Sequence, residues 1–292
     1  AVPAIVIGKI KKAPVFLWVM DLWPESLTVA GSIDNRLILG AVGRLVRWIY
    51  DSADYVLIQS KAFVGEIQKY STRKVASERL VYFPSWADDV LSETEGSNVV
   101  LEKPIDEFWI VFTGNIGEAQ DFPSILEAAR STETHPSIKW KIVGDGRKKA
   151  WVENEINDKK ITNVELMGRF PLEDMPVFYA NADALLVSLK SDIIFSKVIP
   201  GKVQAYLAAG RPVLAMIDGE ASRIINECGG GYACDAGMSD QLAQNVIRLY
   251  SAELELRDAM ASSARSCYEE HFTKRLAMRK LNELFELGSK RS

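Results

Sequence analysis

Residues 112–120 read FTGNIGEAQ and directly follow the apolar run 109–111 (WIV). The apolar run predicts a buried strand that ends at two glycines, Gly114 and Gly117. A glycine-rich loop after a strand has two interpretations. It is either a tight turn that needs positive φ angles or a backbone cradle whose N–H groups bind a phosphate. Both interpretations stay open on this loop alone, so the rest of the chain has to decide.

The composition is that of a globular protein. The 292 residues suffice for two domains, and 48% of them are hydrophobic and 25% charged. A net charge of −4 gives no strong positive field, so we expect no nucleic-acid partner. Three cysteines outside CxxC spacing and two distant histidines predict no metal site, and we expect reduced, buried thiols in a cytoplasmic protein. No run approaches the ~20 apolar residues of a membrane span.

After the opening loop, strands and helices alternate regularly. This alternation predicts an α/β fold with a doubly wound parallel sheet. Such sheets bind ligands outside the carboxyl ends of their strands, where the glycine-rich loops of this chain fall. The predicted strands cover residues 108–112, 139–143, 164–167, 184–189 and 213–216, and the predicted helices cover residues 123–130, 150–157, 175–181, 202–209 and 223–227. Residues 240 to about 288 are also expected to be helical.

A shorter α/β pattern comes first, with strands over residues 15–20, 54–59 and 80–83 and helices over residues 37–50 and 62–70. The stretch DLWPES (21–26) is expected to be a loop. Residues 88–104 (DDVLSETEGSNVVLEKP) have the composition of a linker. We therefore expect a first domain with its linker over residues 1–101, a second domain over residues 102–265 and a terminal helix over residues 266–292.

Three more segments carry candidate chemistry. In GDGRKK (144–149), the basic residues would either meet a diphosphate or begin a solvated helix. In GRF (168–170), Arg169 would be a surface residue and Phe170 would either belong to the core or face a base. Lys202 begins a predicted helix, where a cation gains nothing from the helix dipole. An anion bound between Lys202 and the helix N–H groups would explain that position.

Taken together, the motifs resemble those of a known family. In chain order they are YFPSW, VFTGNIG, IVGDGR, GRFPLEDMPVFYANADALLVSL, GKVQAYLAAGRPVLA and YEEHFTKRLAMRKL. The set resembles the retaining GT-B glycosyltransferases of the large family-4 group. DLWPES and ADYVLIQS resemble its bacterial O-antigen and capsule branch. The resemblance covers almost the whole chain from residue 14 onward.

The resemblance implies two Rossmann-like domains. The second would bind a nucleotide-sugar, usually a UDP-sugar, and the first would bind the acceptor, with the terminal helix returning to the first domain. No metal or other cofactor is implied, because helix dipoles and basic side chains offset the charge of the leaving diphosphate. The reaction implied is transfer of a hexosyl or N-acetylhexosaminyl group, with retention, to a saccharide or polyprenyl-linked acceptor in surface polysaccharide biosynthesis.

The resemblance also assigns residues. Asp145, Gly146 and Arg147 would lie at the nucleotide, Arg169 and Phe170 at the base, and Lys202 at the diphosphate. Asp21 is the predicted catalytic residue, at the edge of the first domain. The residues predicted to bind the donor are Gly114, Asn115, Gly117, Asp145, Gly146, Arg147, Arg169, Phe170, Lys202 and Gln204.

The chain departs from the family pattern at several positions. The family typically carries two glutamates eight residues apart, one for the donor sugar and one for the ribose. Lys197 and Ala205 stand at these positions, and Gln204 would substitute only in part. Gln120 stands where a basic residue is frequent, and Met20 stands where a histidine is frequent.

A complete first domain of this family would begin with further strands. We therefore expect either a chain that begins inside a longer gene product or a second chain that completes the domain. Residues 1–20 and the helix with Arg44, Arg47 and Trp48 would rest on the inner face of a bacterial membrane. Alternatively, they would be a buried strand and an ordinary packed helix. Two other functions remain: a sugar-nucleotide epimerase of similar fold, and a non-catalytic subunit that depends on a partner.

Overall fold

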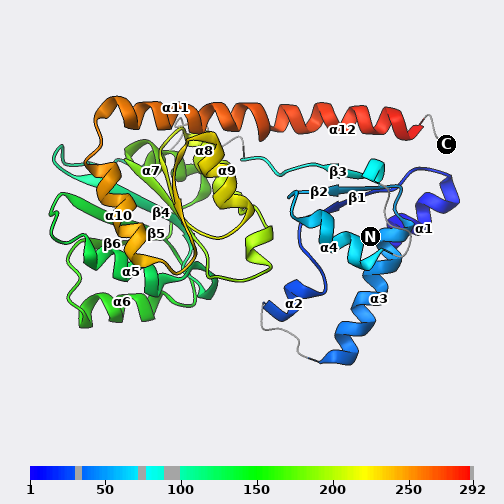
Figure 1. Cartoon of the computed structure of the whole chain (residues 1–292), viewed down its shortest axis with the longest axis horizontal. Helices are drawn as coiled ribbons and strands as arrows, with labels where there is room; N and C mark the ends of the chain where they lie inside the picture. The colour runs from blue at the N-terminus through cyan, green and yellow to red at the C-terminus, as the bar shows by residue number, and fades with distance from the viewer. Residues whose placement is uncertain (30–34, 72–76, 89–98, 290–292) are drawn as a thin grey trace. The chain divides into compact units, whose positions relative to one another are not determined.

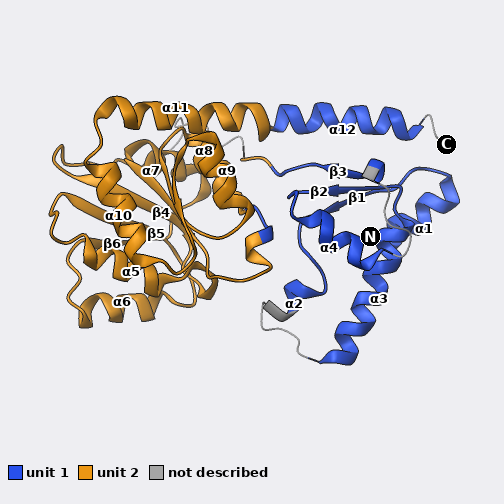
Figure 2. Ribbon diagram, viewed as in Figure 1, with its two compact units in different colours: residues 1–85, 197–199, 274–292 blue, residues 86–196, 200–273 orange. Residues whose placement is uncertain are grey.

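The computed structural model describes residues 1–29, 35–71, 77–88 and 99–289. The chain divides into two compact units (Figure 2). Unit 1 comprises Ala1–Ser85, Lys197–Ile199 and Lys274–Ser292, and unit 2 comprises Trp86–Ser196 and Pro200–Thr273. The linker predicted over residues 88–104 lies largely outside the described residues, since 89–98 are not among them. None of the helices in the described part of the chain is long and apolar enough to span a bilayer.

Unit 2 is built on a six-stranded parallel sheet (Figure 1). The strand order is β6-β5-β4-β7-β8-β9. Along the chain, strands are added first on one side of β4 and then, from β7 onward, on its other side, as in a doubly wound sheet. The strands are β4 (Phe108–Asn115), β5 (Ile138–Asp145), β6 (Val164–Gly168), β7 (Ala184–Ser188), β8 (Val213–Met216) and β9 (Gly231–Cys234).

Helices cover both faces of this sheet. α10 packs on α5, and α11 packs on α8 and α9. Figure 1 shows α5, α6 and α10 on one face and α7, α8, α9 and α11 on the other. The helices are α5 (Phe122–Ser131), α6 (Lys149–Asp158), α7 (Met175–Asn181), α8 (Gly201–Ala209), α9 (Glu220–Cys228), α10 (Ser239–Tyr250) and α11 (Leu254–His271). Short 3-10 turns are η3 (Glu118–Gln120), η4 (Leu172–Asp174) and η5 (Phe195–Lys197).

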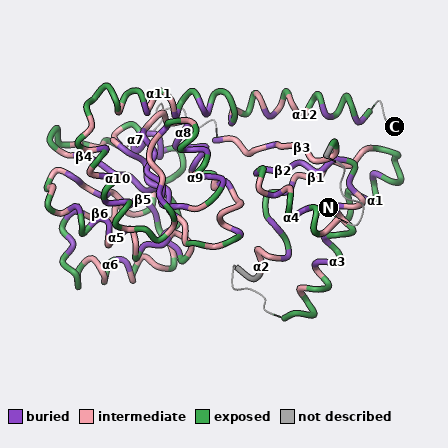
Figure 3. Tube along the Cα trace, viewed as in Figure 1, coloured by how far each residue is buried: buried purple, intermediate pink, exposed green. Residues whose placement is uncertain are grey.

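The core of unit 2 follows from the pattern of its strands. Successive side chains of a strand point to opposite faces, so a sheet covered on both faces needs continuous apolar runs. Ile110, Val111 and Phe112 of β4 are all completely buried, and burial is concentrated along the strands in Figure 3. Trp140 is also fully buried, and its indole N–H donates to the Thr132 hydroxyl over 3.1 Å. The largest side chain of this core therefore has its polar atom satisfied.

Unit 1 contains a three-stranded parallel sheet in the order β1-β2-β3. Its core joins β2 to α4, where Val56, Phe63 and Ile67 are completely buried. The terminal helix α12 belongs to this unit, and the rings of Phe285 and Phe16 lie 5.0 Å apart. The elements are β1 (Phe16–Val19), β2 (Tyr55–Ile58), β3 (Leu80–Tyr82), α1 (Val2–Lys11), α2 (Glu25–Val29), α3 (Arg36–Ser52), α4 (Phe63–Tyr70), η1 (Ser77–Arg79) and α12 (Lys274–Ser289).

Three elements differ from the sequence-based expectation. The first residues form helix α1 and not a buried strand, because Pro3 lies in the first turn, where its missing N–H is not needed. A Cβ on Gly8 would lie only 2.4 Å from Cγ2 of Val15, so this glycine permits close packing and does not break the helix. DLWPES is not all loop, since α2 begins at Glu25. Strand β9 was not predicted at all.

Candidate functional site

Unit 2 has a cavity of about 660 Å³ at the carboxyl ends of β4, β5 and β6. The loops after these three strands are far apart in sequence, and the parallel sheet brings them to one edge. Seven of the ten residues predicted to bind a donor line this cavity: Gly114, Asn115, Asp145, Gly146, Arg147, Arg169 and Phe170. Val143, Gly144 and Met175 complete the lining.

The glycines of the first two loops allow two backbones to approach closely. β4 and β5 stay in register to their ends, where Gly114 pairs with Gly144. A Cβ on Gly144 would lie 1.8 Å from the Gly114 carbonyl oxygen, and a Cβ on Gly146 would lie 2.3 Å from the Ile116 carbonyl oxygen. Gly144 also has a φ of +153°. The glycines therefore serve loop packing, and the packed backbone forms the cavity wall.

Lys202 lies against the first loop. A Cβ on Gly114 would be 2.8 Å from Cε of Lys202, so the absence of a side chain at position 114 leaves the space that Lys202 occupies. The Lys202 ammonium lies 3.9 Å from the centroid of the Phe112 ring. Burial lowers the pKa of Lys202 to about 8. An anion beside this ammonium would replace the hydration that the charge has lost.

A buried polar cluster holds α8 and α7 to β4 directly beneath the first loop. The Tyr206 hydroxyl accepts a hydrogen bond from the Thr113 N–H over 3.1 Å. The Thr113 hydroxyl lies 3.1 Å from the Tyr206 hydroxyl and 3.3 Å from that of Tyr179. Burial raises the pKa of both tyrosines, so they stay neutral and keep these bonds. This cluster was not predicted from the sequence, because its residues meet only when α7 and α8 pack on β4.

The second and third loops contribute most of the polar lining. The Asp145 carboxylate accepts a hydrogen bond from the Gly146 N–H over 2.8 Å, which fixes the start of the second loop. Arg147 and Arg169 are both exposed. The Phe170 ring packs edge-on against Phe178 of α7, with centroids 4.7 Å apart. This contact holds the third loop at the cavity and leaves the two guanidinium groups as its cationic side chains.

Gly117 and Gln204 are not among the residues that line the cavity. The Gly117 N–H donates to the side-chain oxygen of Gln120 over 3.2 Å, so Gln120 closes the loop where a basic residue was expected. Gln204 is completely buried within α8. Ala205, at the position where the resemblance implies a second glutamate, is buried as well.

A cluster of opposite charges joins the ends of β4, β5 and β7. Glu118 follows the first loop and forms ion pairs with Lys148, over 2.7 Å, and with Lys190. Hydrogen bonds from Lys148 and Lys190 lower the pKa of Glu118 to about 2. Glu118 and both lysines line a smaller hollow together with Gly117. Sequence reasoning passed over Glu118 and Lys190, because residues 72 positions apart meet only once the sheet is formed.

Asp21 belongs to unit 1, in the segment that follows β1, and its side chain is exposed. The end of β1 is fixed to β2 by the Gln59 side chain, whose amide donates to the Met20 carbonyl over 2.5 Å. The predicted catalytic role of Asp21 stays a prediction.

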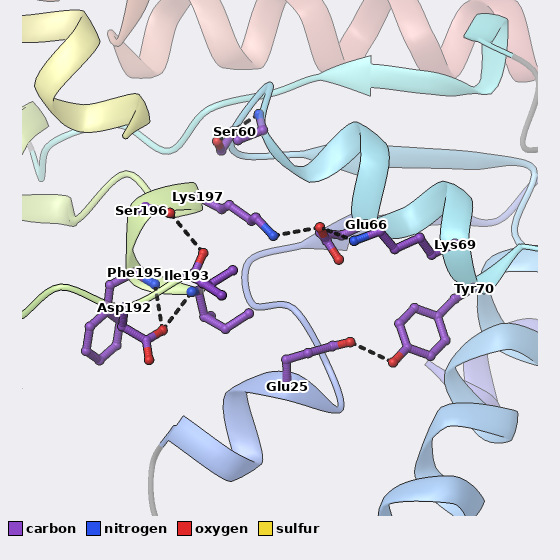
Figure 4. A network of polar contacts seen from close by, with 12 residues as sticks. Glu25, Ser60, Glu66, Lys69, Tyr70, Asp192, Ile193, Phe195, Ser196 and Lys197 are labelled. Atoms are coloured by element: carbon purple, nitrogen blue, oxygen red, sulfur yellow. Dashed lines mark hydrogen bonds and ion pairs between the residues drawn. The ribbon is translucent and has the colours of Figure 1, made fainter. Parts of the chain in front are cut away.

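Lys197, at the position where the resemblance implies a first glutamate, forms an ion pair within unit 1 (Figure 4). Its ammonium lies 2.6 Å from the Glu66 carboxylate, which also accepts from Lys69 over 2.8 Å. Burial alone would raise the pKa of Glu66, but hydrogen bonds from both lysines lower it overall. Nearby, Tyr70 donates to Glu25 over 2.6 Å. The cation at position 197 is therefore already paired with a carboxylate of α4.

Within residues 1–29, 35–71, 77–88 and 99–289, no group of three or more His, Cys, Asp or Glu side chains is placed to hold a metal ion.

Two solved structures share this architecture over nearly the whole chain. Anabaena HepE, in complex with UDP and glucose, superposes with a TM-score of 0.71 at 17% identity and covers 98% of this chain and 74% of its own. A glycosyltransferase from Rickettsia africae superposes with a TM-score of 0.73 at 17% identity and covers 99% of this chain and 80% of its own. These similarities confirm the predicted GT-B fold class.

The sequence comparisons name a family. A putative colanic acid biosynthesis glycosyl transferase, WcaI, of Escherichia coli (strain K12) is 28% identical over 153 residues, which are 49% of this chain and 36% of that protein. The match thus spans about a third of the length of this curated relative. The family model described as glycosyl transferases group 1 matches residues 95–266, which include every strand and helix around the cavity. The chain therefore belongs to the glycosyl transferases group 1 family.

Proposed function

We propose that the chain is a retaining glycosyltransferase that moves a hexosyl or N-acetylhexosaminyl group from a UDP-sugar to a saccharide or polyprenyl-linked acceptor in surface polysaccharide biosynthesis. The observation that carries the proposal is the cavity of unit 2, lined by three strand-end loops with Lys202 beside it. The presence of UDP and glucose in the HepE structure and the colanic acid role in the name of WcaI support the choice of donor and pathway type.

In this proposal the chain acts mainly through fixed charges and dipoles. The Lys202 ammonium, at the start of α8, stabilises the negative charge that develops on the leaving diphosphate, and the N-terminal end of the α8 dipole acts in the same direction. Arg147 and Arg169 orient the nucleotide, and the backbone at Phe170 borders the base. Because the Lys202 pKa is about 8, the side chain is charged at neutral pH without help from a metal ion. Asp21 is proposed to act on the acceptor side.

The donor site is tested by calorimetric titration with UDP, UDP-glucose and UDP-N-acetylglucosamine, with a chelator present throughout. We expect saturable binding, and we expect Arg169→Ala to weaken it by about tenfold, since a charge-assisted hydrogen bond contributes about 1.5 kcal/mol or more. Arg130→Ala is the matched control, because Arg130 is an exposed arginine that pairs with Glu127 on α5. If the wild-type protein binds none of these nucleotides, the proposal is wrong.

The surface of unit 1 indicates what the protein contacts besides its substrates. Helices α1 and α3 pack together, and both expose large apolar side chains. Lysines and arginines lie among these side chains, as on helices that rest on an anionic membrane. We propose peripheral membrane contact through this surface. β1 is one of the two edge strands of the three-stranded sheet, so the alternative is that a further segment or a second chain pairs with it.

One observation favours a second candidate, a subunit that binds the donor but needs a partner for transfer. The family carboxylate is replaced by Lys197, and the lysine is held by Glu66. Product analysis after incubation with UDP-sugar and acceptor separates the candidates: transfer by this chain alone excludes the partner-dependent subunit, and an epimerised nucleotide-sugar would indicate the epimerase.

A further inference from the structure

Two of the three cysteines form a pair in unit 2, away from the loops of the donor cavity. Cys228 is the last residue of α9 and is partly exposed, whereas Cys267 lies in α11 and is buried. α9 and α11 pack against each other, and the two thiols are close enough for each to shift the pKa of the other. The Cys228 thiol also donates to the Ile225 carbonyl over 3.4 Å. The third cysteine, Cys234, is buried at the end of β9 and bonds only weakly, to backbone oxygens.

The backbone between α9 and β9 packs closely between Cys228 and α11. Gly229 ends α9 in the left-handed conformation, with φ of 66°. A Cβ on Gly230 would lie 3.0 Å from Cys228 Sγ and 3.1 Å from both Cα and Cβ of Ala264 on α11. Ala264 and Cys267 are three residues apart and therefore lie on the same face of that helix. The turn thus holds the Cys228 thiol against the helix face that carries Cys267.

The pairing also makes the two thiols chemically different. A hydrogen bond from Cys267, followed by those from the backbone at Gly230 and at Cys228 itself, lowers the pKa of Cys228 to about 7. The same contact with Cys228 raises the pKa of Cys267, and burial and Glu270 act in the same direction. Cys228 is therefore the thiol of the pair that ionises more readily, and Cys267 remains a thiol beside it. A partly exposed thiol of lowered pKa next to a second thiol is the arrangement that reacts reversibly with oxidants.

We propose that Cys228 and Cys267 are a reversible oxidation site that forms an intramolecular disulfide in the presence of a peroxide. The Cys228 thiolate attacks one peroxide oxygen, the O–O bond breaks, and a sulfenic acid and hydroxide result. Cys267 then loses its proton as its sulfur attacks the Cys228 sulfur, the S–O bond breaks, and water leaves. Together, the two sulfurs give up two electrons, and these reduce the peroxide.

The disulfide would join the end of α9 covalently to α11. α11 also supports α8, because the Arg265 guanidinium donates to the Ala208 carbonyl over 2.6 Å. Oxidation is therefore expected to stiffen the helical layer from which Lys202 emerges. We expect it to raise the melting temperature of the protein by a few degrees, because it constrains the unfolded chain. The inference does not depend on the donor or on the reaction.

The test is mass spectrometry of the folded protein after a short treatment with hydrogen peroxide, without reducing agent. We expect a loss of 2 Da, a tryptic peptide pair linked through Cys228 and Cys267, and recovery of the original mass with dithiothreitol, the masses following from loss of two hydrogens. Cys267→Ser should instead leave a sulfenic acid on Cys228 that dimedone labels, whereas Cys228→Ser should give neither product. Circular dichroism confirms that each variant is folded.

Cys234→Ser is the matched control and should form the same disulfide as the wild type. Burial raises the pKa of Cys234 to about 11, so iodoacetamide at pH 7 should alkylate Cys228 at least tenfold faster than Cys234. The inference is wrong if the folded wild type gives only intermolecular disulfides or none. It is equally wrong if Cys267→Ser yields no label or if Cys234 reacts as fast as Cys228.

Discussion

At the scale of single residues, Lys202 lowers the stability of the protein and is also the proposed contact for the diphosphate. Its usual pKa of 10.5 falls to about 8 because the ammonium is buried beside Phe112. A fall of this size corresponds to roughly 3 kcal/mol of lost hydration, of which contact with the aromatic ring returns about 1 kcal/mol. The simplest reason to retain a charge that destabilises the ligand-free protein is that a bound anion stabilises it. Here that anion would be the diphosphate.

Replacement of this lysine separates stability from binding. Lys202→Met keeps the apolar stem and removes the charge, so we expect the free energy of unfolding at pH 7 to rise by about 1–2 kcal/mol. UDP affinity should fall at least about tenfold, since a charge-assisted contact is lost. Because the folded-state pKa lies below the unfolded one, the destabilisation is complete below pH 8 and disappears as the pH rises towards 10.5.

Urea unfolding at pH 7 and at pH 10, with calorimetry for UDP, measures both effects. Lys159→Met is the control, because Lys159 is an exposed lysine at the end of α6 that pairs with Glu155. This control should change neither the free energy of unfolding nor the free energy of UDP binding by more than about 0.5 kcal/mol. A Lys202→Met protein that is less stable than the wild type at pH 7, or that binds UDP equally well, would contradict this account.

At the scale of elements, the meeting of β4 and β5 is the least tolerant point of the site. Gly144→Ala would place a methyl group 1.8 Å from the Gly114 carbonyl at a φ of +153°. The backbone cannot move aside as a flexible side chain can. We therefore expect the free energy of unfolding to fall by about 3 kcal/mol or more and the cavity to be distorted. Chemical denaturation measures the loss. Gly65→Ala, on the exposed face of α4 with open space around it, should instead stabilise by about 0.5–1 kcal/mol.

The elements of unit 2 were predictable wherever local pattern and packing agree. Continuous apolar runs predicted β4, β7 and β8, because a strand buried on both faces has little choice of residues. In β5 the apolar residues alternate at first with the partly buried Lys139 and Lys141. β9 (GYAC) has no such run. It forms because Gly231, whose Cβ would lie 1.9 Å from the Val213 carbonyl, lets the chain pair closely with β8. α1 was missed for the opposite reason, since Pro3 and Gly8 suggest a break that packing removes.

The candidate site, too, was predictable from the sequence only in part. The glycine loops and their basic residues were visible as local motifs, and the sheet topology explains why seven of the predicted residues share one cavity. The contacts that hold those loops were not visible. Thr113 meets Tyr206 across 93 positions, and Lys190 meets Glu118 across 72. Nothing in either local sequence encodes these partners, because they depend on how α8 and β7 pack against β4.

At the scale of the whole molecule, the two units carry different surfaces. The cavity at the carboxyl ends of β4, β5 and β6 is lined by residues of unit 2. Unit 1 instead exposes apolar side chains on neighbouring helices, with the Lys9 ammonium 5.9 Å from the Trp48 ring. Exposed fractions reach 73% for Ile10 and 85% for Leu37. The apolar residues exposed on α1 and α3 are Val2, Val6, Ile7, Ile10, Leu37, Ile38, Leu45 and Trp48.

Binding to vesicles tests what this surface contacts. We expect the protein to sediment with vesicles containing anionic phospholipid, less so as salt is raised, because Lys9, Arg44 and neighbouring basic groups are screened. Ile10→Ser with Trp48→Ser should weaken the association by about tenfold or more, since each apolar side chain withdrawn from the interface loses about 1 kcal/mol or more. UDP affinity should not change, because the cavity lies in the other unit. Leu254→Ser, which alters a leucine of α11 that is 60% exposed, is the matched control. Should the wild type ignore anionic vesicles and form a stable complex with a second copy that the double variant abolishes, the apolar faces of α1 and α3 are a protein interface and the membrane proposal fails.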